Sequence, residues 1–421
     1  MTSNSPAEPG EKPDTRWHLS VIPLYVAIGS PGLLTTLVAL SLGASVADIG
    51  VMTATAAIAT TLLSVFWGRL SDFSGSRRKY LLFFFTALCP VFLALSIASS
   101  VPQLTLFYAF LVSITSGITP IAVMYTVESH RGKNWEHGVA KYNALTSIGN
   151  ILGLLGFSYV AQFLETRWLF YISASMCLLA LALLWRMGRE PEITLERHQF
   201  PLRSFHDAER FLSPRPIIHY LDIRHFRIPR SLKELTPLHL LFLAAFVHWT
   251  GISFLNVGQT PLMRALGLSD SMILAVNCVA GAAQAVAFFS VARFLKPDSS
   301  WLLNRVVAVR SGLILCWAVL PVFIYYPVPY VFVFPLIVSV VWSIFYALIW
   351  LPVTSAAISQ APFDRKGRVQ GELMSAIGVA NAVGAYFGGL VISTFGYTVG
   401  FVLASAIALL ARPIMSRIDM A

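Results

Sequence analysis

Long uninterrupted apolar runs constrain this chain more than any other feature of its sequence. Stretches of about 20 mostly apolar residues follow one another along nearly the whole chain, and each is long enough to cross a bilayer as a helix. The runs lack the alternation of apolar and polar residues that a membrane β-strand shows. Because lipid offers no hydrogen-bond partners to backbone groups, the sequence predicts an all-α membrane protein.

Composition supports the same class. Of 421 residues, 56% are hydrophobic and 12% are charged, whereas about 25% are charged in an average soluble chain. The first eighteen residues lack the basic and apolar regions of a cleaved signal peptide. The four cysteines lie singly in separate runs, so we expect no metal and no cofactor. The formal charge of +10 collects in short loops without a nucleic-acid-binding module, so we expect no nucleic-acid partner.

The apolar runs form two sets of six, which predicts about twelve transmembrane helices. The first set covers residues 19–43, 46–67, 80–100, 104–127, 142–162 and 167–187. The second set covers residues 237–257, 271–292, 307–325, 328–351, 370–394 and 397–411. A polar, arginine-rich stretch separates the two sets, and it is either a solvated connector or a segment lying on the anionic inner leaflet.

The distribution of basic residues predicts the orientation. Lys and Arg flank the even-numbered runs on one side, whereas the opposite loops carry only Arg167 and Arg264. Basic residues are retained on the cytoplasmic side, so we expect a multi-pass protein of the plasma membrane with both termini in the cytoplasm. The expected regions are a cytoplasmic N-terminus at 1–18, a six-helix bundle at 19–188, a cytoplasmic central loop at 189–236, a second six-helix bundle at 237–412 and a cytoplasmic C-terminus at 413–421.

An internal repeat indicates that the two bundles are pseudo-symmetric. Pro120, Gly138, Asn150 and Gly153 recur as Pro352, Gly371, Asn381 and Gly384, at an offset of 231 to 233 residues. Gly149, Gly153 and Gly156 in one run match Gly384, Gly388 and Gly389 in the other. Glycines at such spacing predict close approach of a neighbouring helix. Duplicated bundles of this kind enclose a central site in many carriers.

The loop at residues 68–79, GRLSDFSGSRRK, resembles the cytoplasmic signature of the major facilitator superfamily. Gly68 permits close approach of a helix, Asp72 supplies an anion and Gly75 turns the chain, before Arg77 and Arg78 reach the headgroups. The resemblance implies two bundles that rock about a central cavity. It also implies that this loop forms an inner gate, with Asp72 facing residues 368–371.

Other residues extend or limit the resemblance. Glu128 and Arg131 resemble an acidic and basic pair of the superfamily, and we expect Glu128 to pair with Arg77 or Arg78 across the inner gate. A charge so close to the interface can also snorkel to water. Phe73 departs from the pattern, where the superfamily usually has a basic residue. The glycine and proline motif of many antiporters and the motif that follows span six in sugar porters are absent, so no subfamily is assigned.

The candidate lining of the cavity is neutral and aromatic, because no acidic residue lies in the middle of a predicted span. The candidates are Asn150, His248, Trp249, Asn256, Gln259, Asn277, Gln284, Trp342, Tyr346 and Asn381. Trp342, Tyr346 and Trp350 share one helix face, which suits stacking on a sugar or aromatic solute and equally suits helix packing. His248 is the one titratable side chain that we place near a span centre, and it is either a proton-coupling group or a packing residue.

These features predict a secondary active or facilitative transporter of a small neutral or amphipathic organic solute, sugar-like or drug-like, working by alternating access. The alternative is a proton-coupled multidrug or metabolite exporter that uses His248. A polytopic membrane enzyme would need converging acids, bases or nucleophiles, which the sequence lacks, and a transporter-like sensor is the third possibility. We expect no enzyme activity. The expected partners are the solute, the bilayer and, under the alternative, protons, with the chain acting as a monomer.

Overall fold

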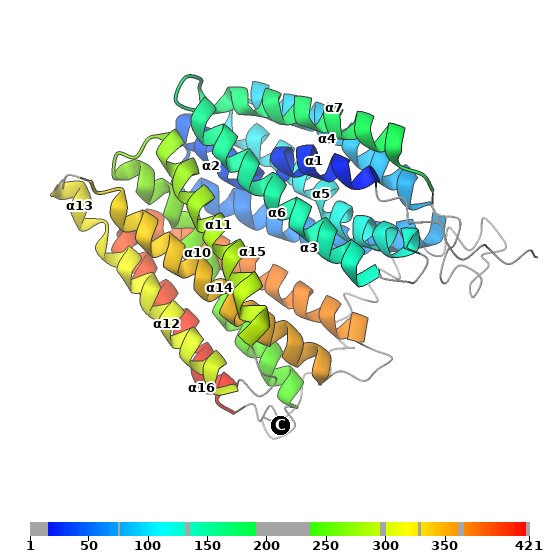
Figure 1. Ribbon diagram of the computed structural model, residues 1–421. Coiled ribbons are helices and arrows are strands. Elements are labelled where there is room, and N and C mark those ends of the chain that lie inside the picture. Colours follow the sequence, from blue (N-terminus) through cyan, green and yellow to red (C-terminus); the bar gives the residue numbers. More distant parts are fainter. Residues whose placement is uncertain are drawn as a thin grey trace, which may run out of the picture.

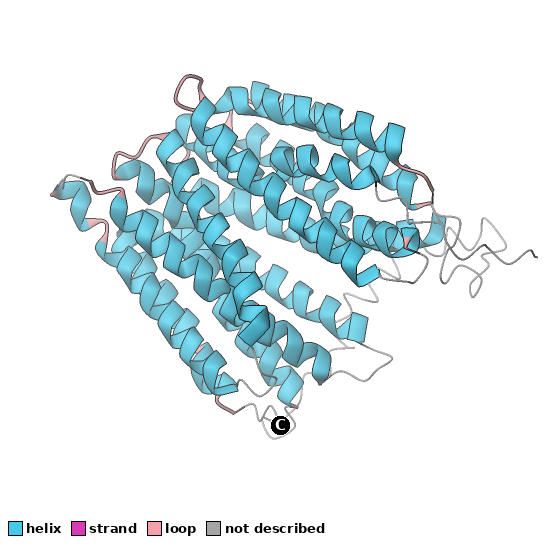
Figure 2. Cartoon of the chain, in the orientation of Figure 1, coloured by secondary structure: helices cyan, strands magenta, loops and turns pink. Residues whose placement is uncertain are grey.

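The computed structural model describes residues 16–74, 76–130, 135–190, 236–294, 300–326, 330–360 and 366–417. Most of the expected central loop lies outside these ranges, as do most of the N-terminal segment and the last four residues. Within the described ranges the chain consists of helices and short connections, as Figure 2 shows.

The first half makes six passes. They are η1 (Arg16–Ser20) with α1 (Val21–Ile28) and α2 (Pro31–Ser41), α3 (Val46–Ser74), α4 (Arg77–Ile97), α5 (Val101–Ser129), α6 (Trp135–Val160) and α7 (Leu169–Met187), the last preceded by η2 (Thr166–Trp168). Pro31 stands at the first position of α2, where its missing N–H costs nothing and a bend in the first pass is accommodated.

The second half makes six more passes. They are α10 (Pro237–Ala265), α11 (Asp270–Phe294), α12 (Ser300–Val319) with α13 (Val322–Tyr325), α14 (Val333–Ser359) and both arms of α15 (Lys366–Leu409), followed by the short α16 (Ala411–Met415). Gly396 divides α15 into two arms, because its φ of 86° and ψ of 169° are not helical. Among the described residues, ten segments are long and apolar enough to span a membrane. Counting α6 and the second arm of α15 separately gives the twelve passes that the sequence predicts.

Two predicted spans in the second half have boundaries that differ from those of the observed helices. The run at 307–325 corresponds to α12 and α13, but α12 begins at Ser300, and the run at 328–351 corresponds to α14, which extends to Ser359. Arg305 lies just before the predicted start and Arg310 lies just after it, where charges often mark a membrane boundary. The helix runs through both arginines instead.

Equivalent helices pack in the same way in the two bundles (Figure 1). In the first bundle α1 packs on α6, α3 on α5 and α4 on α7, and in the second bundle α10 packs on α15, α11 on α14 and α12 on α15. The pseudo-symmetry expected from the repeat is therefore present in the packing. The fold is a twelve-helix membrane fold of two six-helix bundles.

Matched glycines make the equivalent helix pairs possible. A Cβ atom at Gly153 would lie 2.6 Å from the Val26 carbonyl oxygen of α1, and one at Gly388 would lie 2.8 Å from the Phe254 Cα of α10. These backbone atoms cannot move aside as a side chain can, so both positions require glycine. Gly156, which the sequence groups with them, faces open space and makes no close contact.

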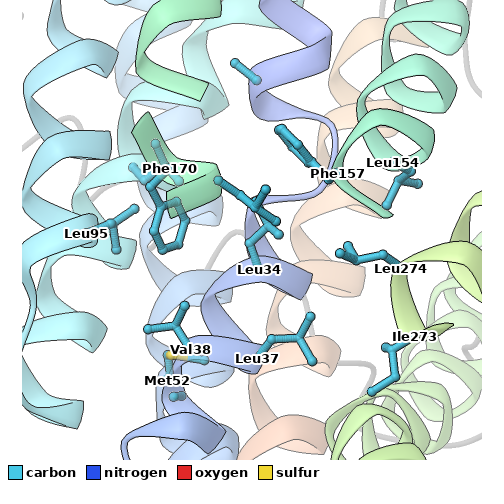
Figure 3. Close-up of a cluster of buried hydrophobic side chains, with 14 of the residues drawn as sticks. Leu34, Leu37, Val38, Met52, Leu95, Leu154, Phe157, Phe170, Ile273 and Leu274 are labelled. Atoms are coloured by element: carbon cyan, nitrogen blue, oxygen red, sulfur yellow. The ribbon is translucent and has the colours of Figure 1, made fainter. Parts of the chain in front are cut away.

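The bundles touch one another mainly through two helix pairs, α3 with α15 and α6 with α11, and α10 makes smaller contacts with α2 and α3. These two pairs are equivalent under the repeat. The first joins pass two to pass eleven, and the second joins pass eight to pass five, which are the matching passes of the opposite bundles. Figure 3 shows the apolar part of this junction, where Leu154 and Phe157 of α6 lie near Ile273 and Leu274 of α11. The junction lies beside the buried core of α2 at Leu34 and Leu37, so one continuous core crosses the boundary between the bundles.

Candidate functional site

The two ends of the bundles differ in their connections. We call the end that carries residues 42–45, 98–100, 161–165 and 266–269 the short-loop end. The opposite end carries Arg77, Arg78 and the other loops rich in Lys and Arg, and we call it the basic end. In Figure 1 the bundles converge toward the short-loop end at the left and spread toward the basic end.

Contacts between α3 and α15 follow one antiparallel register that opens along its length. Near the short-loop end a Cβ at Gly50 would lie 2.8 Å from the Gly389 Cα. Eleven residues further along α3 and eleven back along α15, Gly378 lies against the Thr61 side chain. Seven residues further, Gly68 and Gly371 each have no atom of the described residues within 4 Å of an added Cβ. The helices therefore touch at the short-loop end and diverge toward the basic end.

The same register shows that Gly68 makes no close helix contact in this conformation, so the role expected for it stays a prediction. We expected a neighbouring helix to lie close to it, whereas the structure leaves space on its Cβ side. The physical reason is the divergence of α3 from α15, because Gly371 is the residue that the register places opposite Gly68. The side chains of Asp72 and Arg368, and all of Gly75 and Arg131, lie outside what the structure describes, so their part in the gate stays a prediction.

Paired serines close α6 against α11 near the short-loop end. The Ser158 hydroxyl donates to the Ser271 carbonyl oxygen at 2.9 Å, and the Ser271 hydroxyl donates to the Ser158 carbonyl oxygen at 2.7 Å. The Cys278 thiol lies 3.7 Å from the Ile151 carbonyl oxygen in the same interface. Small side chains let these two backbones approach closely, as in other membrane helix pairs.

A charged group also joins the bundles at the short-loop end. Arg264 of α10 donates to the Leu37 carbonyl oxygen of α2 at 2.9 Å and lies 3.8 Å from the Asp270 carboxylate. The other oxygen of Asp270 accepts from the Thr166 hydroxyl of η2. Arg264 and Asp270 of the second bundle thus each form a hydrogen bond with a residue of the first bundle. In the sequence Arg264 is merely one of two exceptions to the charge bias, and this contact accounts for it.

Replacing Arg264 with glutamine is expected to loosen the short-loop end. A hydrogen bond from a charged donor contributes about 1.5–3 kcal/mol, so its loss shifts the population toward opening at this end by roughly tenfold or more. In a variant that keeps Cys278 as its sole cysteine, we expect faster alkylation by a water-soluble maleimide. Arg167→Gln, which removes the other exceptional arginine at this end, is the matched control and should leave the rate unchanged. Equal rates in both variants would contradict a closing role for Arg264.

At the basic end, the first bundle holds its motif loop by a buried ion pair. Arg77 Nε lies 3.3 Å from the Glu128 Oε1, and its Nη1 donates to the Ser71 hydroxyl. The backbone N–H of Arg77 and the Ser76 hydroxyl donate to Glu190 at 2.8 and 2.9 Å, which caps the N-terminus of α4. The expected partner of Glu128 is therefore Arg77, but the contact lies within one bundle and does not cross between the two.

Arg78 turns away from this pair. Its Nη2 donates to the Trp185 carbonyl oxygen at the end of α7, at 2.9 Å. Glu190, which had no role in the sequence interpretation, proves to be the cap of α4. No local signal marks it, because it lies just after the sixth span, more than 100 residues from the helix that it caps.

The candidate amides are distributed over four helices and do not converge on one point. Asn150 lies against Gly29 with its Oδ1 buried, and Asn277 donates to the Ile273 carbonyl oxygen of its own helix at 2.8 Å. Gln259 donates to Ser339 across α10 and α14 at 3.3 Å. The remaining amides are Asn256, which is exposed, and Gln284 and Asn381, which are half-buried. They supply polar groups along the bundles rather than a single binding constellation.

The second bundle contains a buried charge that the sequence interpretation missed. Arg310, in the middle of α12, is fully buried, and its Nη1 lies 3.4 Å from the His248 Nε2. Its guanidinium carbon lies 4.1 Å from the Trp342 ring centre and 5.5 Å from the Tyr346 ring centre. We call these four residues the Arg310 cluster. His248 is therefore not the one titratable group near a span centre, because the helix around Arg310 begins earlier than predicted.

The aromatic residues of the cluster continue along α14 and across to α10. Tyr346 stacks on Trp350 with ring centres 5.7 Å apart and an angle of 16°. Trp350 in turn meets Trp249 edge-on at 5.9 Å. On the face that the sequence predicts for Trp342, Tyr346 and Trp350, the last two rings thus form a stacked pair, and Arg310 lies over Trp342 and Tyr346.

The hydrogen bonds of His248 fix its tautomer. A guanidinium can only donate, so Nε2 accepts from Arg310. Nδ1, 3.4 Å from the Ala408 carbonyl oxygen, must then carry the proton. A second proton on His248 would place two cations side by side in a buried site, which is costly. This geometry favours a neutral His248 that orients Arg310, over a group that carries protons.

Comparisons with known proteins agree with the architecture. The family described as Major Facilitator Superfamily matches residues 19–371 of the sequence. The chain belongs to the major facilitator superfamily. It is a membrane transporter and not an enzyme. No curated protein matches it by sequence.

Solved structures of other transporters have the same fold. The nucleoside transporter NupG superimposes with a TM-score of 0.71 at 12% identity, covering 97% of this chain and 99% of that chain. The xylose transporter XylE from E. coli, in an inward-open conformation, gives 0.68 at 13% identity with 95% of each chain covered. A peptide transporter of the POT family gives 0.70 at 13% identity, with 95% and 96% covered. At these identities the likeness concerns the superfamily fold alone.

Proposed function

We propose that this superfamily member is a secondary transporter that moves a small neutral or amphipathic organic solute by alternating access. The observation that carries the proposal is the register of α3 on α15, which is tight at Gly50 and Gly389 and open at Gly68 and Gly371. A carrier of this type needs two bundles that can pivot about a shared junction. The junction here combines an apolar part with glycine, serine and single charged contacts, and the latter can be broken and remade at modest cost.

The orientation of the charges supports the direction of this opening. Lys and Arg collect at the basic end, and such residues are retained in the cytoplasm. With that topology both termini are cytoplasmic, the membrane is the plasma membrane, and the structure is the state open to the cytoplasm. The closed state at that side then brings Gly68 to Gly371 and the motif loop to the start of α15, as the family resemblance implies.

The nature of the side chains supports the class of solute. The bundles offer neutral amides and an aromatic face of Trp342, Tyr346 and Trp350, in which Tyr346 stacks on Trp350. These groups suit flat or ring-shaped molecules with hydrogen-bonding groups. Two of the solved neighbours are named as nucleoside and xylose transporters, whose solutes are of this kind. The chain acts as a monomer in this proposal, because each pair of bundles encloses one complete pathway.

Flux in reconstituted vesicles tests the proposal. Purified protein should exchange or accumulate at least one labelled solute from a panel of nucleosides, sugars, aromatic metabolites and drugs, and vesicles without protein should not. Runs with and without a pH gradient, repeated with His248→Gln, test the alternative of a proton-coupled exporter. Because His248 is held neutral beside Arg310, we expect the same pH dependence in both proteins. No flux for any solute of the panel would contradict the transporter proposal, and a pH dependence lost in His248→Gln would favour the exporter.

A further inference from the structure

We propose that Arg310 is an anion-binding group and that the transported solute carries an oxyanion, a carboxylate or a phosphate, beside an aromatic or similarly flat part. This rests on the proposed function and restricts its solute to amphipathic molecules that carry a negative charge. The site is the Arg310 cluster together with the aromatic face of α14. It lies in the second bundle, away from the ion pair of Arg77 and Glu128.

The depth of Arg310 makes its charge expensive. It lies seven residues beyond Leu303, where the apolar stretch Leu303–Tyr325 begins. At 1.5 Å per residue this is about 10 Å along the apolar stretch. A guanidinium stays protonated in proteins, so it cannot escape this cost by losing its proton. Charged residues at such depth are retained for ion and substrate pathways more often than for packing.

No carboxylate of the described residues pairs with Arg310. The ion pairs described here are those of Arg77 with Glu128 and Arg264 with Asp270. The contacts that Arg310 does make are with a neutral imidazole and two aromatic rings. A cation over an aromatic ring gains about 2 kcal/mol when desolvated, which is less than the several kcal/mol that burial of an ion costs. Among the residues that the structure describes, the charge therefore lacks a counter-charge.

The donors left over have the geometry of an oxyanion site. Nε and Nη2 of Arg310 are buried and have no hydrogen-bond partner among the described residues. These two atoms form one side of the guanidinium, and together they can donate two parallel hydrogen bonds to one carboxylate or phosphate. His248 occupies Nη1 on the other side, so it fixes the direction in which the free pair of donors points.

The neighbouring rings complete the site. Arg310 and His248 are fully buried, whereas Trp342 and Tyr346 are half-buried. The two rings therefore cover the guanidinium, and their own edges reach the surface of the bundle. An anion that binds Nε and Nη2 lies close to these rings, and its flat part can stack on the face that Tyr346 and Trp350 continue. This is why we expect a ring or another flat group beside the oxyanion.

Thermal unfolding of the full chain in detergent tests the site with defined probes. Benzoate, phenyl phosphate and inorganic phosphate supply the oxyanion with and without a ring, and benzamide is the neutral isostere of benzoate. We expect benzoate and phenyl phosphate to raise the unfolding midpoint of the wild type, inorganic phosphate to do so weakly, and benzamide not to. Arg310→Met should weaken the apparent affinity for benzoate tenfold or more. Arg305→Met, on the same helix but exposed, is the matched control and should respond as the wild type does.

A measurement without any ligand separates this proposal from a structural role. If Arg310 is an anion-binding group, its unpaired buried charge destabilises the ligand-free protein. Methionine fills the same site without a charge, so Arg310→Met should unfold at a temperature a few degrees above that of the wild type. A lower midpoint than the wild type would show that Arg310 is a strut between α10, α12 and α14, and would overturn the proposal. Failure of every oxyanion to stabilise the wild type, or equal responses to benzoate and benzamide, would overturn it as well.

Flux distinguishes this inference from the proposed function. Vesicles that carry neutral solutes but no anion would leave the transporter proposal intact and refute the anion site. If the protein transports neither neutral solutes nor anions, transport of the tested solutes is refuted. Stabilisation by benzoate that depends on Arg310 would still support the binding site. We expect uptake of an aromatic anion that Arg310→Met reduces at least tenfold and Arg305→Met does not reduce.

Discussion

A valine at Gly389 is expected to hold the short-loop end apart and to reduce transport by at least tenfold. A Cβ at this position would lie 2.8 Å from both the Gly50 Cα and the Val46 carbonyl oxygen. These are backbone atoms of α3, so the contact can be relieved only by moving the helix. Overpacking of this kind costs about 1–3 kcal/mol, and it acts only on the conformation in which α3 and α15 touch at this end. The expected result is a shift of the population toward the opposite state, together with slower exchange between the two.

Labelling of Cys278 measures this shift directly. Cys278 is almost fully buried in the contact of α6 with α11, and opening of the short-loop end exposes it. In a variant with Cys278 as its sole cysteine, Gly389→Val should raise the rate of maleimide labelling roughly tenfold, the change that follows from about 1.4 kcal/mol. Gly156→Val is the control, because it adds the same side chain where nothing lies within 4 Å. Wild-type labelling and wild-type flux in Gly389→Val would show that this glycine contact does not close the junction.

The general fold could be predicted because the bilayer allows few alternatives. Apolar runs of helix length must be helices in lipid, and the repeat of Gly153 as Gly384 predicted that equivalent helices pack in the same way. The glycine prediction succeeded where the helices belong to one bundle. Gly149 and Gly153 meet α1, and Gly384 and Gly388 meet α10. Such contacts hardly change when the bundles move, so a single sequence pattern can specify them.

Contacts between the bundles were harder to predict, because they depend on the conformational state. Gly68 has the motif context of a helix contact, yet it faces open space here. One sequence must encode both a closed and an open basic end, and a few kcal/mol separate such states. No pattern in the sequence states which end is closed. Arg264 shows the converse case, since its partner is the Leu37 carbonyl oxygen, a backbone atom that carries no residue-specific signal.

The Arg310 cluster escaped prediction for a different reason. The predicted span around Arg310 starts at residue 307, so the sequence places Arg310 near the membrane boundary, where charged residues are common. The helix begins at Ser300, so the same residue lies well inside the span. The partners of Arg310 come from α10 and α14, and no spacing along the chain relates them to α12. The signal that was available is an arginine well inside an apolar helix, which is rare enough to mark a functional residue.

Removal of the Glu128 carboxylate is expected to destabilise the first bundle strongly. The side chains of Glu128 and Arg77 are only 4% and 7% exposed, and they lie 3.3 Å apart between α5 and α4. Breaking a buried ion pair by deleting one partner costs about 3–5 kcal/mol, because the other charge stays buried without the charge that faced it. We therefore expect Glu128→Ala to lower the unfolding midpoint in detergent by many degrees. We expect the double variant Arg77→Met with Glu128→Met to recover most of the loss, because it buries no charge at this pair.

Glu190→Ala is the matched control for this experiment. Glu190 also accepts hydrogen bonds at the start of α4, from Ser76 and the backbone of Arg77, but its side chain is exposed. Loss of such a cap costs about 1 kcal/mol, so its midpoint should fall far less than that of Glu128→Ala. A double variant no more stable than Glu128→Ala would show that shape rather than charge matters between α4 and α5. A stable double variant that folds but transports at least tenfold more slowly would assign the pair a role in gating, because the charges would then be needed for the motion and not for the fold.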